Sequence, residues 1–249
     1  MHALQLRGLA KRFGDVRAVD GLDLDVPRGS FFGLVGPNGA GKTTTLSMAT
    51  GLVRPDAGTV SVLGTDLWSD PTAAKRLLGV LPDGVRLFDR LTGRELVTYH
   101  GLLRGLDRVV VRDRTEQLLA ALGLDTSADG LVVDYSAGMT KKIALACALV
   151  HAPRLLLLDE PFEAVDPVSA GTIRAILHQV VDGGGTVVLS SHVMELVERL
   201  CDHVAVVHAG RVVAAGPLDE VRAGGTLEER FVDLVGAPDR MQDLTWLRS

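Results

Sequence analysis

Short apolar stretches separated by turn residues run along much of the chain. Between residues 4 and 9, and again between 19 and 26, apolar positions alternate with polar ones, and a Pro-Arg-Gly turn follows at 27–29. Alternation with a period of two indicates strands with one buried face. The pattern predicts an antiparallel hairpin or small sheet at the start of the chain, with further short strands among the glycines of 51–64 and at 77–81.

Elsewhere the apolar runs are continuous and do not alternate. Such runs occupy residues 31–35, 155–158, 186–189 and 204–207. Strands covered on both faces in a parallel sheet have this composition. These four segments therefore predict a mostly parallel sheet.

Helical periodicity predicts the other elements. It is strongest over residues 92–124, where glycines flank each segment, and we interpret this region as a helical insertion. Further helices are expected at about 41–48 and 141–150. Two more are expected near the end of the chain, at 218–222 and 227–235.

The composition is that of a folded protein and excludes several classes. A chain of 249 residues with 47% apolar and 23% charged residues is neither disordered, collagenous nor a disulfide scaffold, and it has room for one large or two small domains. The formal net charge is -5, so the chain lacks the excess of basic residues that is typical of a nucleic-acid-binding protein. Arg104, Arg108 and Arg112 are interspersed with acidic residues and are better explained as a solvated face. Cys147 and Cys201 stand alone in apolar stretches and are expected to be buried free thiols.

Targeting signals are also missing from the sequence. No apolar run approaches the roughly 18 residues that a bilayer crossing needs. The first residues lack the apolar segment of a signal peptide. We therefore expect a cytoplasmic protein whose role at a membrane would come through a partner.

A glycine-rich segment follows the first buried strand. Residues 36–43 read Gly-Pro-Asn-Gly-Ala-Gly-Lys-Thr and satisfy the phosphate-loop pattern G-x-x-x-x-G-K-[ST] in full, between a predicted strand and a predicted helix. Backbone N–H groups would surround an anion, Lys42 would reach the β- and γ-phosphates, and the Thr43 hydroxyl would bind Mg²⁺. The expected nucleotide contacts are Gly36, Pro37, Asn38, Gly39, Ala40, Gly41, Lys42, Thr43 and Thr44.

Two adjacent acids follow the buried strand at 155–158. Consecutive side chains on an extended strand diverge, so Asp159 and Glu160 can have different tasks. Asp159 is expected to face the Mg²⁺ ion, and Glu160 the position of an attacking water. Acids at a strand end could otherwise be merely solvated, but the phosphate loop favours the catalytic interpretation.

Four other segments complete this pattern: Phe13, Tyr-Ser-Ala-Gly-Met at 135–139, Glu-Ala-Val-Asp at 163–166, and the strand 186–192 that ends in histidine. With them, the chain resembles the nucleotide-binding subunit of ATP-binding-cassette (ABC) transporters over nearly its whole length. The resemblance implies ATP and Mg²⁺ as cofactors. It also implies an α/β fold: a P-loop NTPase (RecA-like) core with a mostly parallel sheet, an N-terminal antiparallel β subdomain and an inserted α-helical subdomain.

The resemblance also divides the chain, which would form a single ABC ATPase domain over 1–249. Residues 1–85 and 150–220 would make the ATP-binding core with the β subdomain. Residues 86–149 would make the helical signature subdomain, and 221–249 a C-terminal helical tail.

By the same resemblance, two nucleotides would be sandwiched in a head-to-tail dimer. Phe13 matches the aromatic residue that stacks on adenine, although it could instead be a core aromatic. Ser136 and Gly138 match the signature loop that covers the γ-phosphate bound to the other subunit, although Ser136 could also be a plain helix cap.

Asp166 matches the acid of the loop through which the two halves sense each other. His192 matches the switch histidine that bridges Glu160 and the γ-phosphate, and a structural histidine is the weaker alternative. The resemblance thus assigns catalysis to Glu160, His192 and Lys42.

Three positions depart from the family pattern. Asp83 stands where a glutamine normally contacts Mg²⁺ and the membrane subunit, and its carboxylate could still reach the metal directly or through water. Ala137 replaces a signature glycine and adds a Cβ near the phosphate. Met139 replaces the signature glutamine, and a thioether is a poor hydrogen-bond partner. These changes predict slow hydrolysis.

The variant signature and the segment 225–236 resemble the branch of the family that drives export of drugs, antibiotics, lipids or polysaccharides. The implied partners are transmembrane permease subunits, docked near residues 83–88, and a second nucleotide-binding subunit, identical or paralogous. No nucleic-acid partner is expected. The protein would be cytoplasmic and peripheral on the inner face of the cell membrane.

Two other classes compete with this interpretation. A GTPase would need an Asn-Lys-x-Asp motif, and the only asparagine in the sequence is Asn38, which excludes that class. A soluble ABC ATPase with a non-transport role stays open as the alternative, although the chain has room for neither a long coiled coil nor a second cassette.

Overall fold

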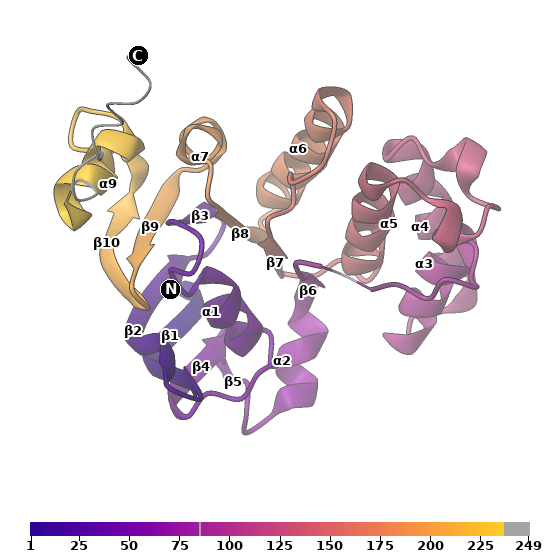
Figure 1. The fold of residues 1–249 in the computed structure, drawn as a ribbon. Helices are drawn as coiled ribbons and strands as arrows, with labels where there is room; N and C mark the ends of the chain where they lie inside the picture. The colour runs from indigo at the N-terminus through magenta and orange to yellow at the C-terminus, as the bar shows by residue number, and fades with distance from the viewer. Residues whose placement is uncertain (85, 237–249) are drawn as a thin grey trace, which may run out of the picture.

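An antiparallel sheet occupies the lower left of the molecule in Figure 1. The computed structural model describes residues 1–84 and 86–236. Within them this sheet has the order β2-β1-β4-β5, and its strands are β1 His2–Phe13, β2 Val16–Pro27, β4 Ala57–Val62 and β5 Thr65–Asp66. Leu6 of β1 lies opposite Leu24 of β2 and Val60 of β4, and all three are buried. The predicted hairpin is confirmed.

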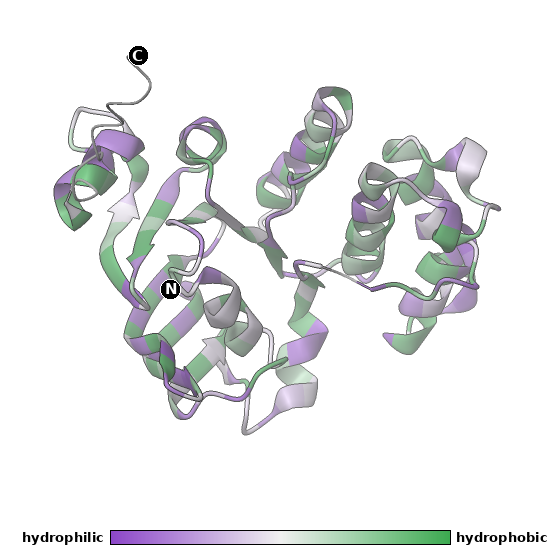
Figure 2. Ribbon diagram, viewed as in Figure 1, coloured by the Kyte–Doolittle hydropathy of each residue, from purple (hydrophilic) through white to green (hydrophobic). Residues whose placement is uncertain are grey.

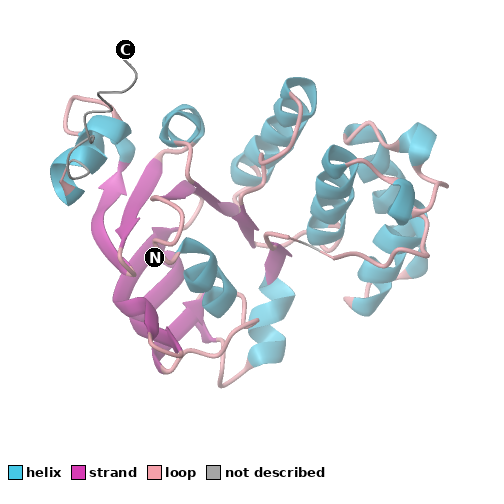
Figure 3. Ribbon diagram, viewed as in Figure 1, coloured by secondary structure: helices cyan, strands magenta, loops and turns pink. Residues whose placement is uncertain are grey.

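A larger, mostly parallel sheet forms the centre of the molecule (Figure 3). Its order in the described residues is β10-β9-β3-β8-β7-β6, and only β10 runs antiparallel to its neighbour. The strands are β3 Phe31–Val35, β6 Leu78–Leu81, β7 Leu155–Asp159, β8 Thr186–Ser191, β9 His203–His208 and β10 Arg211–Pro217. The four predicted buried strands are confirmed. The strand expected at 77–81 begins at Leu78, because Leu77 ends a helix.

Both faces of the parallel sheet are covered by apolar side chains. In β7, Leu156 and Leu158 belong to one core cluster, whereas Leu155 and Leu157 belong to the other. The first cluster continues into the helices at the right of Figure 1, and the second into the antiparallel sheet. Figure 2 shows the matching band of hydrophobic residues along these strands. Burial on both faces explains why the sequence of these strands does not alternate.

Four helices flank the two sheets. They are α1 Lys42–Ala49, α2 Pro71–Leu77, α6 Pro167–Asp182 and α7 Met194–Leu200. Only α1 is predicted from the sequence. The start of α6 carries a clear signal that the sequence analysis missed, because Asp166 caps the helix and Pro167 occupies its first position.

A group of helices without strands lies at the right of Figure 1. It comprises α3 Gly93–Leu103, α4 Arg108–Ala121 and α5 Ala137–Leu149, with two short 3₁₀ turns between α4 and α5. Thr92 and Glu95 form a capping box that fixes the start of α3. The predicted helical insertion is therefore confirmed, and we call α3 to α5 the helical unit.

Two further helices, α8 Leu218–Arg222 and α9 Leu227–Val235, follow β10 where the sequence predicts them. The last part of the expected C-terminal tail, residues 237–249, lies outside the described residues. Cys147 and Cys201 are buried and free, as expected. Among residues 1–84 and 86–236, no helix combines the length and the apolar character that a membrane crossing requires.

Candidate active site

The carboxyl ends of β3, β6, β7 and β8 meet at one edge of the parallel sheet. Val35 lies opposite Ser191, Asp159 opposite Ser190, and Leu81 opposite Leu158. The residues that follow these strand ends line a cleft of about 650 Å³. Open parallel sheets bind ligands at this edge. The cleft is lined by Val16, Arg17, Ala18, Asn38, Gly39, Ala40, Gly41, Lys42, Thr43, Thr44, Asp83, Glu160, Glu163, His192, Ala209 and Gly210.

The loop between β3 and α1 has a backbone that only glycine adopts easily. Gly39 and Gly41 have φ values of 80° and 103°. A Cβ atom at Gly41 would lie 2.4 Å from the carbonyl oxygen of Ala18, which cannot yield without moving the backbone of β2. No side chain caps the first N–H groups of α1, and residues 41–44 line the cleft. This is the geometry of an anion site at a helix N-terminus.

Lys42 is almost completely buried beneath this loop, with 6% of its side chain exposed. Its Nζ atom donates to the carbonyl oxygens of Gly36 and Pro37, at 2.7 and 3.2 Å, and lies 4.0 Å from Oε1 of Glu160. Burial lowers the pKa of Lys42, and the charges of Glu160 and Asp159 oppose that shift. A buried ammonium at the mouth of an anion site can bind a phosphate group.

Three of the predicted site residues lie around a small cavity beside the main cleft. Thr43, Asp83 and Asp159 all line this cavity, whose volume is about 50 Å³. Asp159 is buried, and its carboxylate accepts a hydrogen bond from the Ser190 hydroxyl. Hydroxyl and carboxylate oxygens are the donors that Mg²⁺ prefers. The residues present therefore fit the predicted metal site.

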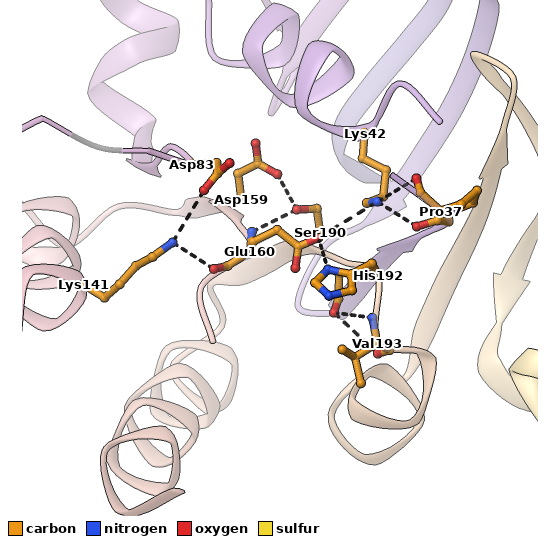
Figure 4. Close-up of polar contacts among 11 residues, drawn as sticks. Pro37, Lys42, Asp83, Lys141, Asp159, Glu160, Ser190, His192 and Val193 are labelled. Carbon is orange, nitrogen blue, oxygen red and sulfur yellow. Dashed lines mark hydrogen bonds and ion pairs between the residues drawn. The ribbon is translucent and has the colours of Figure 1, made fainter. Parts of the chain in front are cut away.

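The side chains of Glu160 and His192 contact each other in the cleft (Figure 4). Nδ1 of His192 lies 3.0 Å from Oε1 of Glu160. Only 14% of the Glu160 side chain is exposed, whereas 42% of the His192 side chain is exposed. A largely buried carboxylate held by an accessible imidazole can orient a water molecule and accept its proton.

The structure adds partners for Glu160 that the sequence analysis missed. The N–H group of Glu160 donates to Oγ of Ser190 at 3.0 Å, and Nζ of Lys141 donates to its carbonyl oxygen at 3.0 Å. Lys141 also lies 3.8 Å from Oδ1 of Asp83. Such pairs join distant segments, and local sequence patterns carry no signal for them.

Other predicted residues lie outside the cleft lining. Gly36 and Pro37 contribute only their carbonyl groups to Lys42. Phe13 is 51% exposed at the tip of the β1–β2 hairpin, opposite Val16, which does line the cleft. The alternative that Phe13 is a core aromatic is therefore wrong. Its ring instead contacts the ammonium of Lys11, at 5.6 Å from the ring centre.

The predicted signature residues, Ser136 and Gly138, are exposed and half-buried respectively, and both lie outside the cleft lining. Ser136 caps α5 by accepting a hydrogen bond from the N–H group of Met139 at 3.3 Å, and Gly138 has open space where a Cβ would lie. Asp166 caps α6, and its bonds to Ser169 lower the pKa of its carboxyl group. Ser136, Gly138 and Asp166 do not line the cleft of their own chain, although Glu163, in the same loop as Asp166, does.

Comparison with known proteins agrees with this geometry. A family model described as ABC transporter matches residues 19–163. The chain is 39% identical over 221 residues to the daunorubicin/doxorubicin resistance ATP-binding protein DrrA of Streptomyces peucetius, covering 89% of this chain and 67% of the relative. It is also 39% identical over 218 residues to the Nod factor export ATP-binding protein I of Cupriavidus metallidurans, covering 88% and 72%. A solved structure of an ATP binding subunit of an ABC transporter is 30% identical, with a TM-score of 0.87 over 93% of this chain and 99% of that one.

Proposed function

The chain belongs to the ABC transporter family as an ATP-binding and ATP-hydrolysing subunit, and we propose that the cleft above the phosphate loop performs this reaction to drive export. The observation that carries the proposal is the convergence of Lys42, Glu160 and His192 on one cleft. These side chains come from three separate segments, and the strand ends bring them together.

The phosphate loop would hold the triphosphate of ATP. The N–H groups at the start of α1 would surround the phosphate oxygens, and Lys42 would exchange its bonds to the loop carbonyls for bonds to the β- and γ-phosphates. Phe13 would stack on the adenine at the hairpin tip, where its face is exposed. In this arrangement the γ-phosphate would point toward Glu160.

Thr43 and Asp159 would hold Mg²⁺, with Asp83 as a further ligand, directly or through water. The ion would neutralise charge on the phosphates during transfer. Ser190 would keep the Asp159 carboxylate oriented toward the ion, because its hydroxyl donates to one carboxylate oxygen.

Glu160 would orient the water that attacks the γ-phosphate in line with the leaving oxygen, and would accept its proton. His192 would hold the Glu160 carboxylate through Nδ1 and present its other nitrogen to the γ-phosphate. The bond that forms joins the water oxygen to phosphorus, and the bond that breaks joins phosphorus to the oxygen of ADP.

A second copy or a paralogue would complete the site. Ser136 is exposed and Gly138 is half-buried, and neither lines the cleft of its own chain, which supports a role toward the nucleotide of a partner in a head-to-tail dimer. Asp166 would act at the same interface. Ala137 and Met139 weaken this contact, because one adds a Cβ and the other, partly buried against the helical core, offers no hydrogen bond. Slow turnover follows from both changes.

Export is the direction that the relatives support, since both are named for drug resistance or for export. The protein would act at the inner face of the cell membrane through permease subunits. These would dock near Asp83 to Phe88, between the core and the helical unit; Phe88 is 56% exposed.

Purification of a Glu160→Gln variant from membranes in the presence of ATP tests this function. The expected result is a complex with a polytopic membrane protein, and crosslinks from that partner should reach residues near Asp83 and Phe88. Recovery of the variant with soluble partners alone would favour a non-transport ATPase. Crosslinks that consistently avoid this segment would contradict the docking site.

A further inference from the structure

Lys141 joins three parts of the molecule at one ammonium group. It belongs to α5, near the end of the helix that Ser136 caps. Its Nζ atom donates to the carbonyl oxygen of Glu160 at 3.0 Å and lies 3.8 Å from Oδ1 of Asp83. Only 13% of its side chain is exposed, so these contacts are shielded from water. Figure 4 shows Lys141 reaching from the helical unit to the end of β7.

The backbone of Glu160 needs support. Its φ value of 46° lies in the left-handed region, which is unfavourable for a residue with a side chain. The conformation turns the Glu160 side chain off the line of β7 and into the cleft, where it meets His192. Strained backbone of this kind persists where surrounding contacts determine it.

Two side chains hold the backbone groups of Glu160 from opposite sides. Ser190 of β8 accepts from the N–H group at 3.0 Å, and Lys141 donates to the carbonyl oxygen at 3.0 Å. The Ser190 contact comes from within the sheet, whereas the Lys141 contact comes from the helical unit. The second bond is charge-assisted and therefore the stronger type.

We propose that Lys141 is a positioning residue. It fixes the left-handed backbone of Glu160, and therefore the catalytic carboxylate, relative to α5. Asp83 in turn keeps the Lys141 ammonium in place. The inference rests on the role proposed for Glu160. It also gives Asp83 a function besides metal binding, because the carboxylate at this position pairs with a lysine across the junction between the core and the helical unit.

The consequence is a link between the two nucleotide sites of a dimer. The N-terminus of α5 carries Ser136, which would contact the nucleotide of the partner. Lys141 on the same helix contacts Glu160 of its own site. A helix is rigid over so short a distance, so an adjustment at Ser136 reaches Glu160 through Lys141.

The test compares Lys141→Met, which keeps the approximate length of the side chain but removes the charge, with Lys141→Arg, which keeps the charge and the hydrogen-bond donors. In the full-length chain within its native complex, Lys141→Met should lower kcat about ten-fold, with KM for ATP changed less than about two-fold. Lys141→Arg should restore most of kcat. Lys75→Met, which removes an exposed charge on α2, is the matched control and should leave both constants unchanged.

Two further measurements separate positioning from folding. Binding of a fluorescent ATP analogue and the thermal unfolding midpoint should be the same for all variants, and Lys141→Gln replaces Lys141→Met if the latter does not fold. In a Glu160→Gln background, Lys141→Met should cause no further loss of rate, because the two residues act as one unit. An unchanged kcat in Lys141→Met, or a rise in KM alone, would overturn the inference.

Failure of the role proposed for Lys141 can be distinguished from failure of the role proposed for Glu160. If Glu160→Gln keeps its turnover, the role proposed for Glu160 is wrong whatever Lys141 does. If Glu160→Gln loses turnover and Lys141→Met keeps it, Glu160 is catalytic and only the role of Lys141 is wrong.

Discussion

Nδ1 of His192 lies 3.0 Å from Oε1 of Glu160 because their strands are parallel neighbours in a fixed register. Glu160 follows β7 and His192 follows β8, and Asp159 lies opposite Ser190. A slip of one residue would turn the side chains of either strand to the other face of the sheet. Both faces are filled with apolar side chains, so the core that stabilises the sheet also sets the catalytic pair.

Replacement of Glu160 by glutamine tests the carboxylate itself. The Glu160→Gln variant keeps the size of the side chain but cannot accept a proton, so kcat should fall by about 10²- to 10⁴-fold while ATP still binds. Phosphate release gives kcat, and light scattering with ATP should detect an accumulated dimer. Glu228→Gln removes the same charge at an exposed position of α9, outside the cleft lining, and is the control, with turnover close to that of the unmodified chain.

A dimer that never accumulates in Glu160→Gln with ATP, in either the isolated or the membrane-assembled protein, would contradict the composite site. Turnover within about two-fold of the unmodified chain would contradict the assignment of Glu160 as the base.

The Gly41→Ala variant tests the phosphate loop. The new Cβ would lie 2.4 Å from the carbonyl oxygen of Ala18 at a φ of 103°, so the loop must shift and the anion site is lost. ATP affinity should fall at least about ten-fold, as measured by fluorescence titration. Gly171→Ala in α6, where only a side-chain nitrogen lies as near as 4.0 Å, should leave affinity unchanged and increase stability slightly. Equal ATP affinity in the two variants would show that the loop tolerates a side chain at residue 41.

The phosphate loop could be predicted from sequence because its chemistry is local. Its pattern is contiguous, and a buried strand and a helix start flank it, so one segment specifies both shape and function. Asp159 and Glu160 were predictable for a related reason, since the carboxyl ends of parallel strands meet at one edge.

The contacts of Lys141 could not be predicted in this way. They depend on how α5 packs against the end of β7 and on the direction of long side chains, and neither leaves a local pattern. The short helix α7 was not predicted for a different reason: seven residues are too few for periodicity to identify a helix. The sequence leaves open whether Phe13 is a core residue or an exposed aromatic, because exposure depends on the tertiary structure.

The charge of Asp83 should weaken nucleotide binding when Mg²⁺ is absent. Asp83 lines the cleft with Lys42 and Thr43, and 45% of its side chain is exposed, so its repulsion of phosphate is partly screened. Asp83→Gln should therefore tighten binding of metal-free ATP by about two- to five-fold and change the turnover of the dimer. Titrations with and without Mg²⁺ give the first quantity, with Asp89→Asn as the control. Unchanged binding and unchanged kinetics would remove any special role for Asp83.

His151 should make the protein less stable at mildly acidic pH. Its Nε2 atom bonds to the carbonyl oxygen of Leu78 at 2.9 Å, and its Nδ1 atom is buried. Burial lowers the pKa of His151 from an ordinary value of 6.5 to about 4, and the positive charges of Arg104 and Arg114 add to the shift. Below pH 6.5 the unfolded chain binds a proton that the native chain does not, so stability present above this pH is lost progressively toward pH 4.

Urea unfolding at pH 7.5 and pH 5.5 measures this loss, and His151→Gln isolates its source. Glutamine retains a donor for the Leu78 carbonyl and does not titrate, so the variant should lose less stability between the two pH values than the unmodified chain. His2→Gln, at an exposed position in β1, should leave the difference unchanged. An equal loss in His151→Gln and the unmodified chain would mean that other groups, His100 among them, account for the acid sensitivity, since burial also lowers the pKa of His100.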